Sequence, residues 1–504
     1  MKRRKFIKDI AVGSTLSMLP LSWVLGKDKQ DIAVTQPAQG PVYNIENFGA
    51  KGDGTTLNTE SIKKAINTCH ANGGGTVYFP AGRYLSGTIV FKSNVTLSLG
   101  AGAVLLGSTK LRHFPEKTPE FRSYTDVNYT NKSLIYAEKV TNIAITGRGV
   151  IDGQGEEEPY QLGGDPKNYK KRPFMIRMIE CENVLVRDIT LTNSPMWVQH
   201  YLACENVNID GITIHSNANV NNDGIDIDCC NKVRISDCEI NSGDDAIVLK
   251  ATAPKDCENI TITNCILRSH TNAFKCGTES TGGFKNITVS NCTIYNVRNA
   301  GIALEMVDGG TMDRVMISNI TMVNAKGGIF IRLGDRARPY LAEGSGRPNE
   351  KQYIREKGMD IPDVGSLQNV ILSNIIATGL DDVGCSITGV PEQSAENITL
   401  ENIRLTFQGG GSKELIHRDV PEEVDSYPAR RMFGKLPAYG FYCRHVNNLR
   451  FHGVQLDYKT DEARPAFVFD DINGLYLTDI QAVKPTSNNP SFLFEDVKNL
   501  KKEN

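Results

Sequence analysis

An excess of basic residues is missing from this 504-residue chain. Lys and Arg together number 56 and Asp and Glu 58, which gives a formal net charge of −2. Residues 1–26, interpreted below as a signal peptide, hold five basic residues and one acidic residue, so their removal would leave a net charge of −6. We therefore expect no nucleic-acid partner. An anionic substrate would need a local cluster of cationic residues to bind it, because the net negative charge of the protein repels it.

The apolar stretch near the start of the chain is too short for a membrane span. A basic segment, Lys2–Lys8, precedes the apolar stretch Ile10–Leu25, which Ser14, Ser17 and Pro20 interrupt. This order is typical of a secretory signal peptide, and the adjacent arginines followed by Phe6 favour the twin-arginine type. Because no lipid-accepting cysteine follows, we expect cleavage near Gly26 and a periplasmic or secreted protein. An uncleaved membrane anchor is the alternative.

The spacing of the twelve cysteines does not suggest a disulfide framework. Cys238, Cys265 and Cys292 are 27 residues apart, and other copies of the same pattern have isoleucine in this place, at Ile189, Ile212, Ile320, Ile375 and Ile403. A cysteine that alternates with isoleucine acts as a small apolar core residue. A second column comprises Cys181, Cys204, Cys230 and Cys257. We expect reduced, stacked cysteines, with a disulfide at Cys69, Cys229 or Cys443 as the alternative.

Internal repetition dominates the rest of the chain. Short alternating segments begin at Asn142, Asn183, Asn206, Lys232, Asn259, Asn286, Arg314, Asn369, Asn397 and Asn448, and from Asn183 to Arg314 the steps are 23, 26, 27, 27 and 28 residues. Period-two alternation inside a period near 27 predicts several short strands per turn of a coil. The leucine–asparagine frame and helical pattern of leucine-rich repeats are absent. We therefore predict an all-β fold, a single-stranded right-handed parallel β-helix with possible asparagine ladders at its corners.

Residues 43–108 are predicted to hold one amphipathic helix. Thr59–Ala71 places Ile62, Ala65, Ile66 and Cys69 on one face, which suits a cap over the first coil. Residues 334–365 and 408–438 are rich in Gly, Pro and charge and are predicted to be long loops over a cleft. We expect one β-helix catalytic domain over 43–485 and no second domain.

A cluster of carboxylates falls in residues 222–247. Asp223, Asp226, Asp228, Asp244 and Asp245 occupy 23 positions, interleaved with isoleucines. Asp223 lies 21 residues before Asp244, whereas the local repeat is 26, so the extra residues 216–221 would have to absorb the offset. Gly243 permits a bend that lets both following aspartates face outward. Neighbouring coils lie ~4.8 Å apart, so these groups can meet and perform acid–base chemistry. An acidic surface or a calcium site is the alternative.

The motifs around these carboxylates resemble family-28 glycoside hydrolases. They read Asn221-Asn222-Asp223-Gly-Ile-Asp and Gly243-Asp244-Asp245, the latter followed by Val-Leu-Lys250. That family comprises polygalacturonases and rhamnogalacturonan hydrolases, which are pectin-lyase-like β-helix enzymes that invert the anomeric centre. The resemblance implies that Asp244 is the general acid and that Asp223 and Asp245 activate water. It implies neither a cofactor nor a catalytic metal.

Two departures from the polygalacturonase pattern bear on the substrate. Asn272 stands near the place of the histidine in Gly-His-Gly, and Ala303-Leu304-Glu305 replaces the Arg-Ile-Lys that grips a galacturonate carboxylate. We therefore expect an exo-acting galacturonidase, a rhamnogalacturonan hydrolase or a related glycosidase rather than a plain endo-polygalacturonase.

A column of charged residues on the same outer face is the predicted sugar-binding surface. Counting from each coil start aligns Asp226, Lys250, Lys275, Glu279, Glu305 and Arg332 to within two positions. A salt-bridge ladder is the alternative. Arg332, with Arg336 and Arg338, is either a replacement carboxylate clamp or a solvated loop base. Trp197 is predicted to stack on a sugar, with core packing as the alternative. His200 is either a pocket residue or a structural one.

Three hypotheses of function follow. The first is an exported, inverting glycoside hydrolase that acts on pectic, galacturonate-containing poly- or oligosaccharide, with exo action favoured because the long loops could close one end of the cleft. The second is a polysaccharide lyase or epimerase, which would need a base at the uronate C5 proton. The third is a non-catalytic carbohydrate-binding β-helix. The sequence does not indicate an oligomeric state.

Overall fold

The computed structural model describes residues 40–125, 129–161, 171–336, 364–486 and 489–503, all within one compact unit, Gly40–Asn504. The predicted signal peptide and most of the predicted loop 334–365 lie outside these residues. In the described part of the chain, no helix is both long and apolar enough to cross a bilayer.

The first half of the unit is built from short strands and one α-helix, α1 (Thr59–Ala71). Short 3₁₀ turns are η1 (Ile45–Phe48), η2 (Leu111–His113) and η3 (Glu158–Tyr160). The strands are β1 (Val42–Asn44), β2 (Asp53–Leu57), β3 (Gly75–Phe79), β4 (Gly82–Ser86), β5 (Ile89–Val90), β6 (Val95–Leu99), β7 (Ala103–Gly107), β8 (Ser133–Glu138), β9 (Thr141–Gly147), β10 (Val150–Asp152), β11 (Phe174–Ile179), β12 (Glu182–Arg187), β13 (Thr190–Thr192), β14 (Gln199–Leu202), β15 (Glu205–Asp210) and β16 (Thr213–Ser216).

In the second half, from β24 onward, most strands are long, because the strands of successive faces are continuous. A further 3₁₀ turn, η5, spans Lys413–Leu415. The strands are β17 (Ile225–Asp228), β18 (Asn231–Ser236), β19 (Glu239–Ser242), β20 (Ile247–Ala251), β21 (Cys257–Thr263), β22 (Ile266–Ser269), β23 (Phe274–Ser280), β24 (Phe284–Met306), β25 (Thr311–Leu333), β26 (Ser366–Leu380), β27 (Cys385–Thr388), β28 (Ala395–Phe407), β29 (Phe441–Tyr458), β30 (Phe467–Ala482) and β31 (Phe492–Glu503).

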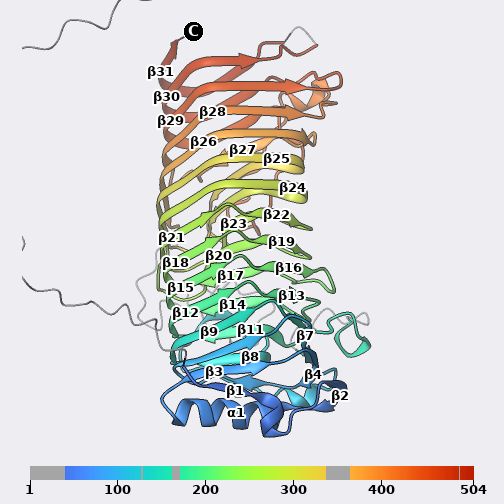
Figure 1. Ribbon diagram of the computed structural model, residues 1–504. Coiled ribbons are helices and arrows are strands. Elements are labelled where there is room, and N and C mark those ends of the chain that lie inside the picture. Colours follow the sequence, from blue (N-terminus) through green and yellow to red (C-terminus); the bar gives the residue numbers. More distant parts are fainter. Residues whose placement is uncertain (1–39, 126–128, 162–170, 337–363, 487–488, 504) are drawn as a thin grey trace, which may run out of the picture. The chain divides into compact units, whose positions relative to one another are not determined.

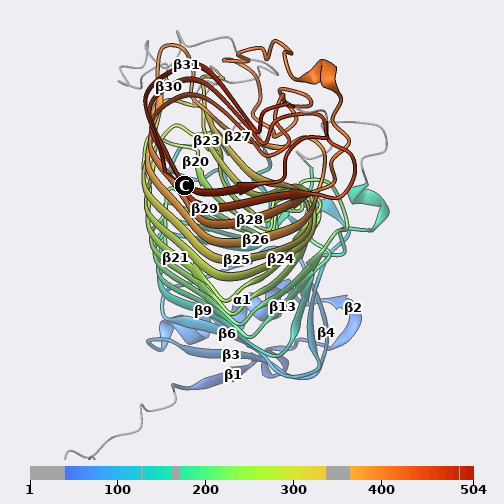
Figure 2. The same ribbon diagram turned by 90° about the horizontal axis from the view of Figure 1, so that it is seen from above.

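These strands pair in parallel from coil to coil and form one 31-stranded sheet within the described residues. Each strand pairs with the equivalent strand of the next coil, as when β15 pairs with β18 and β18 with β21. Figure 1 shows the coils stacked on one another, and in the view from above (Figure 2) successive strands overlie each other. The predicted right-handed parallel β-helix is confirmed.

The core consists of apolar columns that run along the stack. Cys292 pairs with Ile320, Ile320 with Ile375, and Ile375 with Ile403, so cysteine and isoleucine occupy one column as predicted. All twelve cysteines are buried and free. The alternative of a disulfide at Cys69, Cys229 or Cys443 is not realised.

Asparagine ladders hold the corners between the strands. Asn183, Asn286 and Asn397 have φ of 56°, 57° and 53°, a left-handed conformation that asparagine tolerates better than most residues. The Asn183 Nδ2 donates to Asn142 Oδ1 (3.1 Å), and Asn397 Nδ2 donates to Asn369 Oδ1 (3.1 Å). The repeated asparagines that begin each segment are therefore corner residues, and the predicted ladders are confirmed.

Helix α1 covers the N-terminal coil, as predicted, below β1 and β3 in Figure 1. Its four predicted apolar residues, Ile62, Ala65, Ile66 and Cys69, are all buried. Asn58 precedes the helix, but its side chain bonds the backbone of Lys51 and Thr56 instead of capping the first turn. The helix is therefore held mainly by its apolar face.

Candidate active site

The two aspartate motifs meet because one connection between strands is longer than the next. Residues 217–224 join β16 to β17, whereas residues 243–246 join β19 to β20, so the earlier connection is four residues longer. Beyond it, Ile225 pairs with Ile247, a step of 22 residues, while Val207 pairs with Val233 at a step of 26. The offset noticed in the sequence is absorbed where it was expected.

Backbone and side-chain hydrogen bonds fix this junction. The Gly224 amide donates to Asp245 O (2.8 Å) and the Asp244 amide donates to Asn222 O (3.2 Å). Asn222 Nδ2 donates to Ser194 O (2.8 Å) and to Met196 O on the preceding coil. A Cβ at Gly243 would lie 2.9 Å from Asn219 O, so the close approach of the two coils requires glycine here.

Asp223, Asp244 and Asp245 form one cluster. One carboxylate oxygen from each lies within 4.8 Å of the others. Asp223 and Asp245 are buried, and Asp244 is half-buried. The structure thus places all three predicted catalytic aspartates together on adjacent coils.

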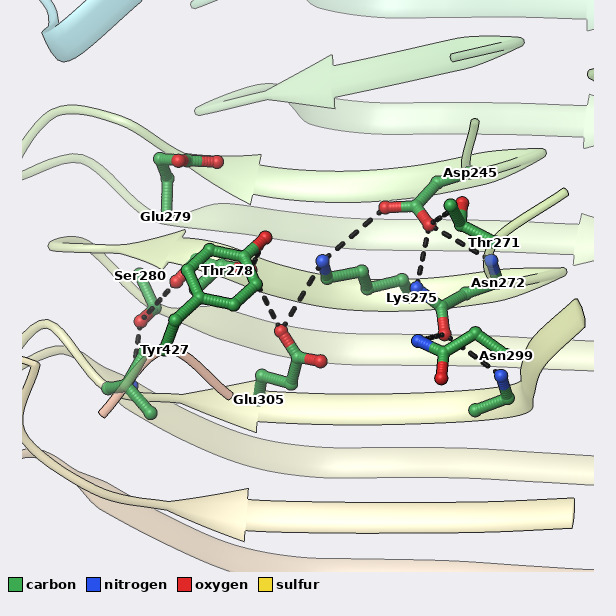
Figure 3. A network of polar contacts seen from close by, with 12 residues as sticks. Asp245, Thr271, Asn272, Lys275, Thr278, Glu279, Ser280, Asn299, Glu305 and Tyr427 are labelled. Carbon is green, nitrogen blue, oxygen red and sulfur yellow. Dashed lines mark hydrogen bonds and ion pairs between the residues drawn. The ribbon is translucent and has the colours of Figure 1, made fainter. Parts of the chain in front are cut away.

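Donors surround Asp245, which is drawn in Figure 3. Its Oδ1 accepts hydrogen bonds from Thr271 Oγ1 (2.6 Å), Asn272 Nδ2 (2.7 Å) and the Asn272 amide (3.1 Å). Its Oδ2 lies 3.4 Å from Lys275 Nζ. Burial by itself raises the pKa of this carboxyl, but the ammonium groups of Lys275 and Lys250, together with these hydrogen bonds, hold the pKa below its usual range.

The pKa values of the other two carboxyls, Asp244 and Asp223, are raised instead of lowered. Burial and the neighbouring Asp245 raise the pKa of Asp244. Burial, followed by the charges of Asp244 and Asp226, raises the pKa of Asp223 well above its usual value. Oδ1 of Asp223 has no hydrogen-bond partner among the described residues. Three adjacent carboxyls with unlike pKa values can hold a proton on one member while another stays ionised.

Two buried lysines balance the cluster. Lys250 Nζ lies 3.9 Å from Asp223, 3.7 Å from Asp226 and 3.3 Å from Glu279. Burial lowers the pKa of Lys250, but the surrounding carboxylates outweigh it and raise the pKa well above its usual value. The carboxylate cluster also has the spacing of a cation site. The lysine ammonium groups already provide positive charge at that spot.

The predicted column of charges is present on one face but is an ion-pair ladder. Lys275 pairs with Asp245 and Glu305 (both 3.4 Å), and Arg336 pairs with Glu279 (3.5 Å). Arg336 also makes a bidentate pair with Asp308 (2.6 and 2.7 Å). Lys250, Lys275, Glu279 and Glu305 are all buried. The salt-bridge alternative therefore describes the contacts within the column, and a role of these residues in sugar binding stays a prediction.

Asp226 was predicted to bind the sugar, and the structure contradicts this. It is fully buried, and neither carboxylate oxygen has a hydrogen-bond partner among the described residues. Burial raises its pKa well above the usual value. With Lys250 3.7 Å from its carboxylate, Asp226 supports that lysine from beneath and does not reach the surface.

Trp197 and His200 are likewise not surface contacts. Trp197 is 2% exposed and packs with Phe174 and Met196, so the expected stacking platform is wrong and the core alternative holds. Lys250 Nζ lies 4.7 Å from the centre of its ring. His200 is fully buried and bonds Asp228 through Nε2 (3.1 Å). Its role is structural, because a buried imidazole held this way has no access to a ligand.

Arg332, predicted as a possible clamp for a substrate carboxylate, bonds backbone carbonyls instead. Its guanidinium donates to Gly389 O (2.9 Å), Glu422 O (2.8 Å) and Glu423 O (3.0 Å), and the side chain is buried. Burial lowers its pKa to about 10. Arg332 therefore anchors the loop 408–438 to the coil and is not a carboxylate clamp. Arg338, its predicted companion, lies outside the described residues.

The same loop brings a residue that sequence reasoning missed. Tyr427 is 62% exposed, and its hydroxyl lies 3.1 Å from Thr278 Oγ1, which donates to Glu305 Oε2 (2.9 Å). Lys275 Nζ and the Arg336 guanidinium each lie 5.9 Å from its ring centre. Figure 3 shows the ring beside Glu305 and Thr278. Thr271 was also missed, and nothing in its local sequence marks it.

A parallel β-helix that carries clustered carboxyls of unlike pKa on its outer face has the organisation of a glycoside hydrolase. The model of the glycosyl hydrolases family 28 matches residues 69–424. The chain belongs to this family.

Individual proteins similar to this chain include polygalacturonases and related enzymes. The chain is 36% identical over 218 residues to a probable polygalacturonase of Vitis vinifera, covering 41% of this chain and 44% of that one. It is 28% identical over 276 residues to an exo-poly-alpha-D-galacturonosidase of Dickeya chrysanthemi, covering 46% and 45%. It thus spans less than half the length of these relatives. A hyperthermoactive exopolygalacturonase from Thermotoga maritima has the same fold, with a TM-score of 0.60, 23% identity and coverage of 82% and 92%.

Proposed function

We propose that this protein is an exported, inverting glycoside hydrolase that cleaves pectic, galacturonate-containing polysaccharide or oligosaccharide from a chain end. The observation that carries the proposal is the aspartate cluster, in which Asp245 is held ionised beside two carboxyls whose pKa values are raised. Proton donation and water activation need this split.

Each aspartate has a distinct task in this proposal. Asp244 is half-buried, so its proton can reach the glycosidic oxygen, and the bond to the leaving sugar breaks as that oxygen is protonated. Asp245 accepts a proton from the attacking water. Asp223, whose Oδ1 has no hydrogen-bond partner among the described residues, accepts a hydrogen bond from the same water and orients it. These steps, as proposed, need only the three aspartates and water.

The distance between the acid and the base bears on which anomer the enzyme releases. Acid and base in inverting glycosidases usually lie ~6.5–9.5 Å apart, to leave room for water. Here the carboxylate oxygens approach within 4.8 Å. We propose inversion because the family to which the chain belongs inverts the anomeric centre, and its motifs assign both Asp223 and Asp245 to the water. Proton NMR during hydrolysis should show the opposite anomer first; the retained anomer would contradict inversion.

Pectic substrate and exo action are proposed on the relatives and on the loop 408–438. The Dickeya chrysanthemi relative is an exo-poly-alpha-D-galacturonosidase. The loop lies over the face that carries the aspartates, since Arg332 and Tyr427 tie it there. A loop that closes one end of the sugar-binding face would favour binding of a chain end. Release of short products from homogalacturonan or rhamnogalacturonan, without early loss of viscosity, is the expected result.

Export is proposed on the basic and apolar order of residues 1–26. The expected result is recovery of the mature chain from the periplasm or medium. Replacement of Arg3 and Arg4 by lysine should leave the precursor in the cytoplasm if the twin-arginine route is used.

The decisive experiment is Asp244→Asn. This change removes the proton donor while keeping its shape, so kcat should fall by about 10²–10⁴-fold. The measurement is the release of reducing ends from pectic glycans, with the folded state checked by thermal unfolding. Asp188→Asn, at an exposed corner with φ of 60°, is the matched control and should retain activity. Undiminished turnover by the Asp244 variant would remove the assignment, and ultraviolet-absorbing products would indicate a lyase.

A further inference from the structure

Three donors converge on one oxygen of Asp245. Thr271 Oγ1, Asn272 Nδ2 and the Asn272 amide all bond Oδ1, at 2.6, 2.7 and 3.1 Å (Figure 3). The other oxygen, Oδ2, has Lys275 Nζ at 3.4 Å. A carboxylate held in this way cannot rotate without losing its hydrogen bonds. Oδ1 is therefore saturated, and Oδ2 is the oxygen available to a reacting water.

The orientation of the Asn272 amide is itself fixed. Its Oδ1 accepts hydrogen bonds from Asn299 Nδ2 (3.0 Å) and from the Ala300 amide (3.1 Å). These two donors require the oxygen of the amide on their side, so the nitrogen must face Asp245. Asn272 is buried, and its carbonyl accepts from the Ala246 amide (2.9 Å). The donors thus run in one direction, from Asn299 through Asn272 to Asp245.

Thr271 links the two neighbouring carboxyls. Its Oγ1 lies 2.7 Å from Asp244 Oδ1 and 2.6 Å from Asp245 Oδ1. A hydroxyl has one hydrogen, so it donates to only one of the two carboxyls at a time. Thr271 alone therefore does not decide which aspartate keeps a proton shared by the pair, and the Asp245 amide also donates to Asp244 Oδ1 (2.9 Å). Asn272 bonds Asp245 and not Asp244, so it biases the proton toward Asp244.

We propose that Asn272, oriented by Asn299, is a positioning residue that acts through Asp245, keeping that carboxylate free of the shared proton and directing its Oδ2 to the water. This inference rests on the proposed function, in which Asp245 is the base. In this inference, the neutral amide of Asn272, which does not titrate, makes the protonation state of the base, Asp245, differ from that of the proton donor, Asp244.

The test is a pH series on three variants of the full chain. Asn272→Leu keeps the size of the side chain and removes both polar atoms. We expect kcat to fall between about tenfold and a hundredfold, because a charge-assisted hydrogen bond is lost. The acid limb of the kcat/KM profile should move up by roughly one pH unit. KM should change by less than about threefold, because the buried amide does not touch the sugar.

Two further variants should shift the acid limb of the kcat/KM profile by a larger and by a smaller amount. Asn272→Asp places a second carboxylate beside Asp245, so the acid limb should move further up than in Asn272→Leu. Asn299→Ala frees the amide orientation and should move the limb in the same direction by a smaller amount. This milder variant keeps the inference testable if the charged variant does not fold. Asn208→Leu, on the outer side of β15, is the matched control and should have the wild-type profile.

The outcomes separate the inference from the proposed function. If Asp245→Asn is inactive but Asn272→Leu and Asn299→Ala keep the wild-type acid limb, the positioning role is wrong and the function stands. If Asp245→Asn retains full turnover, the proposed base is wrong and the inference falls with it. A general loss of activity with an unmoved acid limb would show a structural role only and would also overturn the inference.

Discussion

Adjacent aspartates in this protein occupy unlike surroundings. Asp245 faces Lys275 and three hydrogen-bond donors, whereas Asp244 is half-buried and borders the ionised Asp245. The pKa of one is lowered and that of the other raised, although they are consecutive in sequence. At the residue scale, the split needed for acid–base catalysis comes from neighbours on the next coil, not from the aspartates themselves.

A charge deletion tests that split. Lys275 lies between Asp245 and Glu305, so the double change Lys275→Met with Glu305→Gln removes the cation without leaving Glu305 as an unpaired buried charge. The pKa of Asp245 should rise without its cation. Because the base must be ionised, activity should then be lost at higher pH than in the wild type as pH falls. The acid limb of kcat/KM is the measurement.

Glu305→Gln alone serves as the control for this prediction. It leaves Lys275 beside Asp245, so the acid limb should stay where it is or move slightly down. An unmoved limb in the double variant would show that the lysine does not set the ionisation of Asp245.

At the scale of the element, the loop 408–438 is tied to the coil and contributes an exposed ring. Arg332 bonds the carbonyls of Glu422 and Glu423, and the Asp335 amide donates to Val424 O (2.9 Å). Tyr427 follows shortly and presents its ring beside Lys275 and Arg336. An exposed aromatic face at the edge of a charged site suits a pyranose ring.

Tyr427→Ala should therefore weaken substrate binding. We expect KM to rise by about tenfold, with kcat changed less, because stacking holds the sugar before and during the reaction alike. Steady-state kinetics on an oligosaccharide series provide the measurement. Tyr427→Phe keeps the ring and should stay near the wild-type KM. Equal kinetics for Tyr427→Ala and the wild type would exclude a sugar contact.

At the scale of the whole molecule, the stacked coils keep every cysteine from solvent. All twelve are buried and free, and Cys292 shares a column with isoleucines. Burial raises the pKa of most of these thiols, including that of Cys385 to about 12, and protonated thiols react slowly. The cysteines thus serve as core residues in a protein proposed to be exported.

Thiol labelling checks this arrangement. The native protein should bind almost no thiol reagent, and the unfolded protein should bind twelve equivalents. The midpoint of thermal unfolding should not change when a reductant is added, because no disulfide contributes to stability. A lower midpoint in reductant would indicate a disulfide and contradict the reduced core.

The β-helix, the capping helix, the cysteine and asparagine columns and the meeting of the aspartates could all be predicted from the amino-acid sequence. These features follow from a repeat of nearly constant length, since strand alternation and coil period are written locally. The burial of Trp197, His200 and Arg332, and the contact of Tyr427 with Thr278, 149 residues away in the chain, became visible in the folded molecule alone. Burial and long-range hydrogen bonds depend on what a distant loop or coil covers, and no local pattern records that.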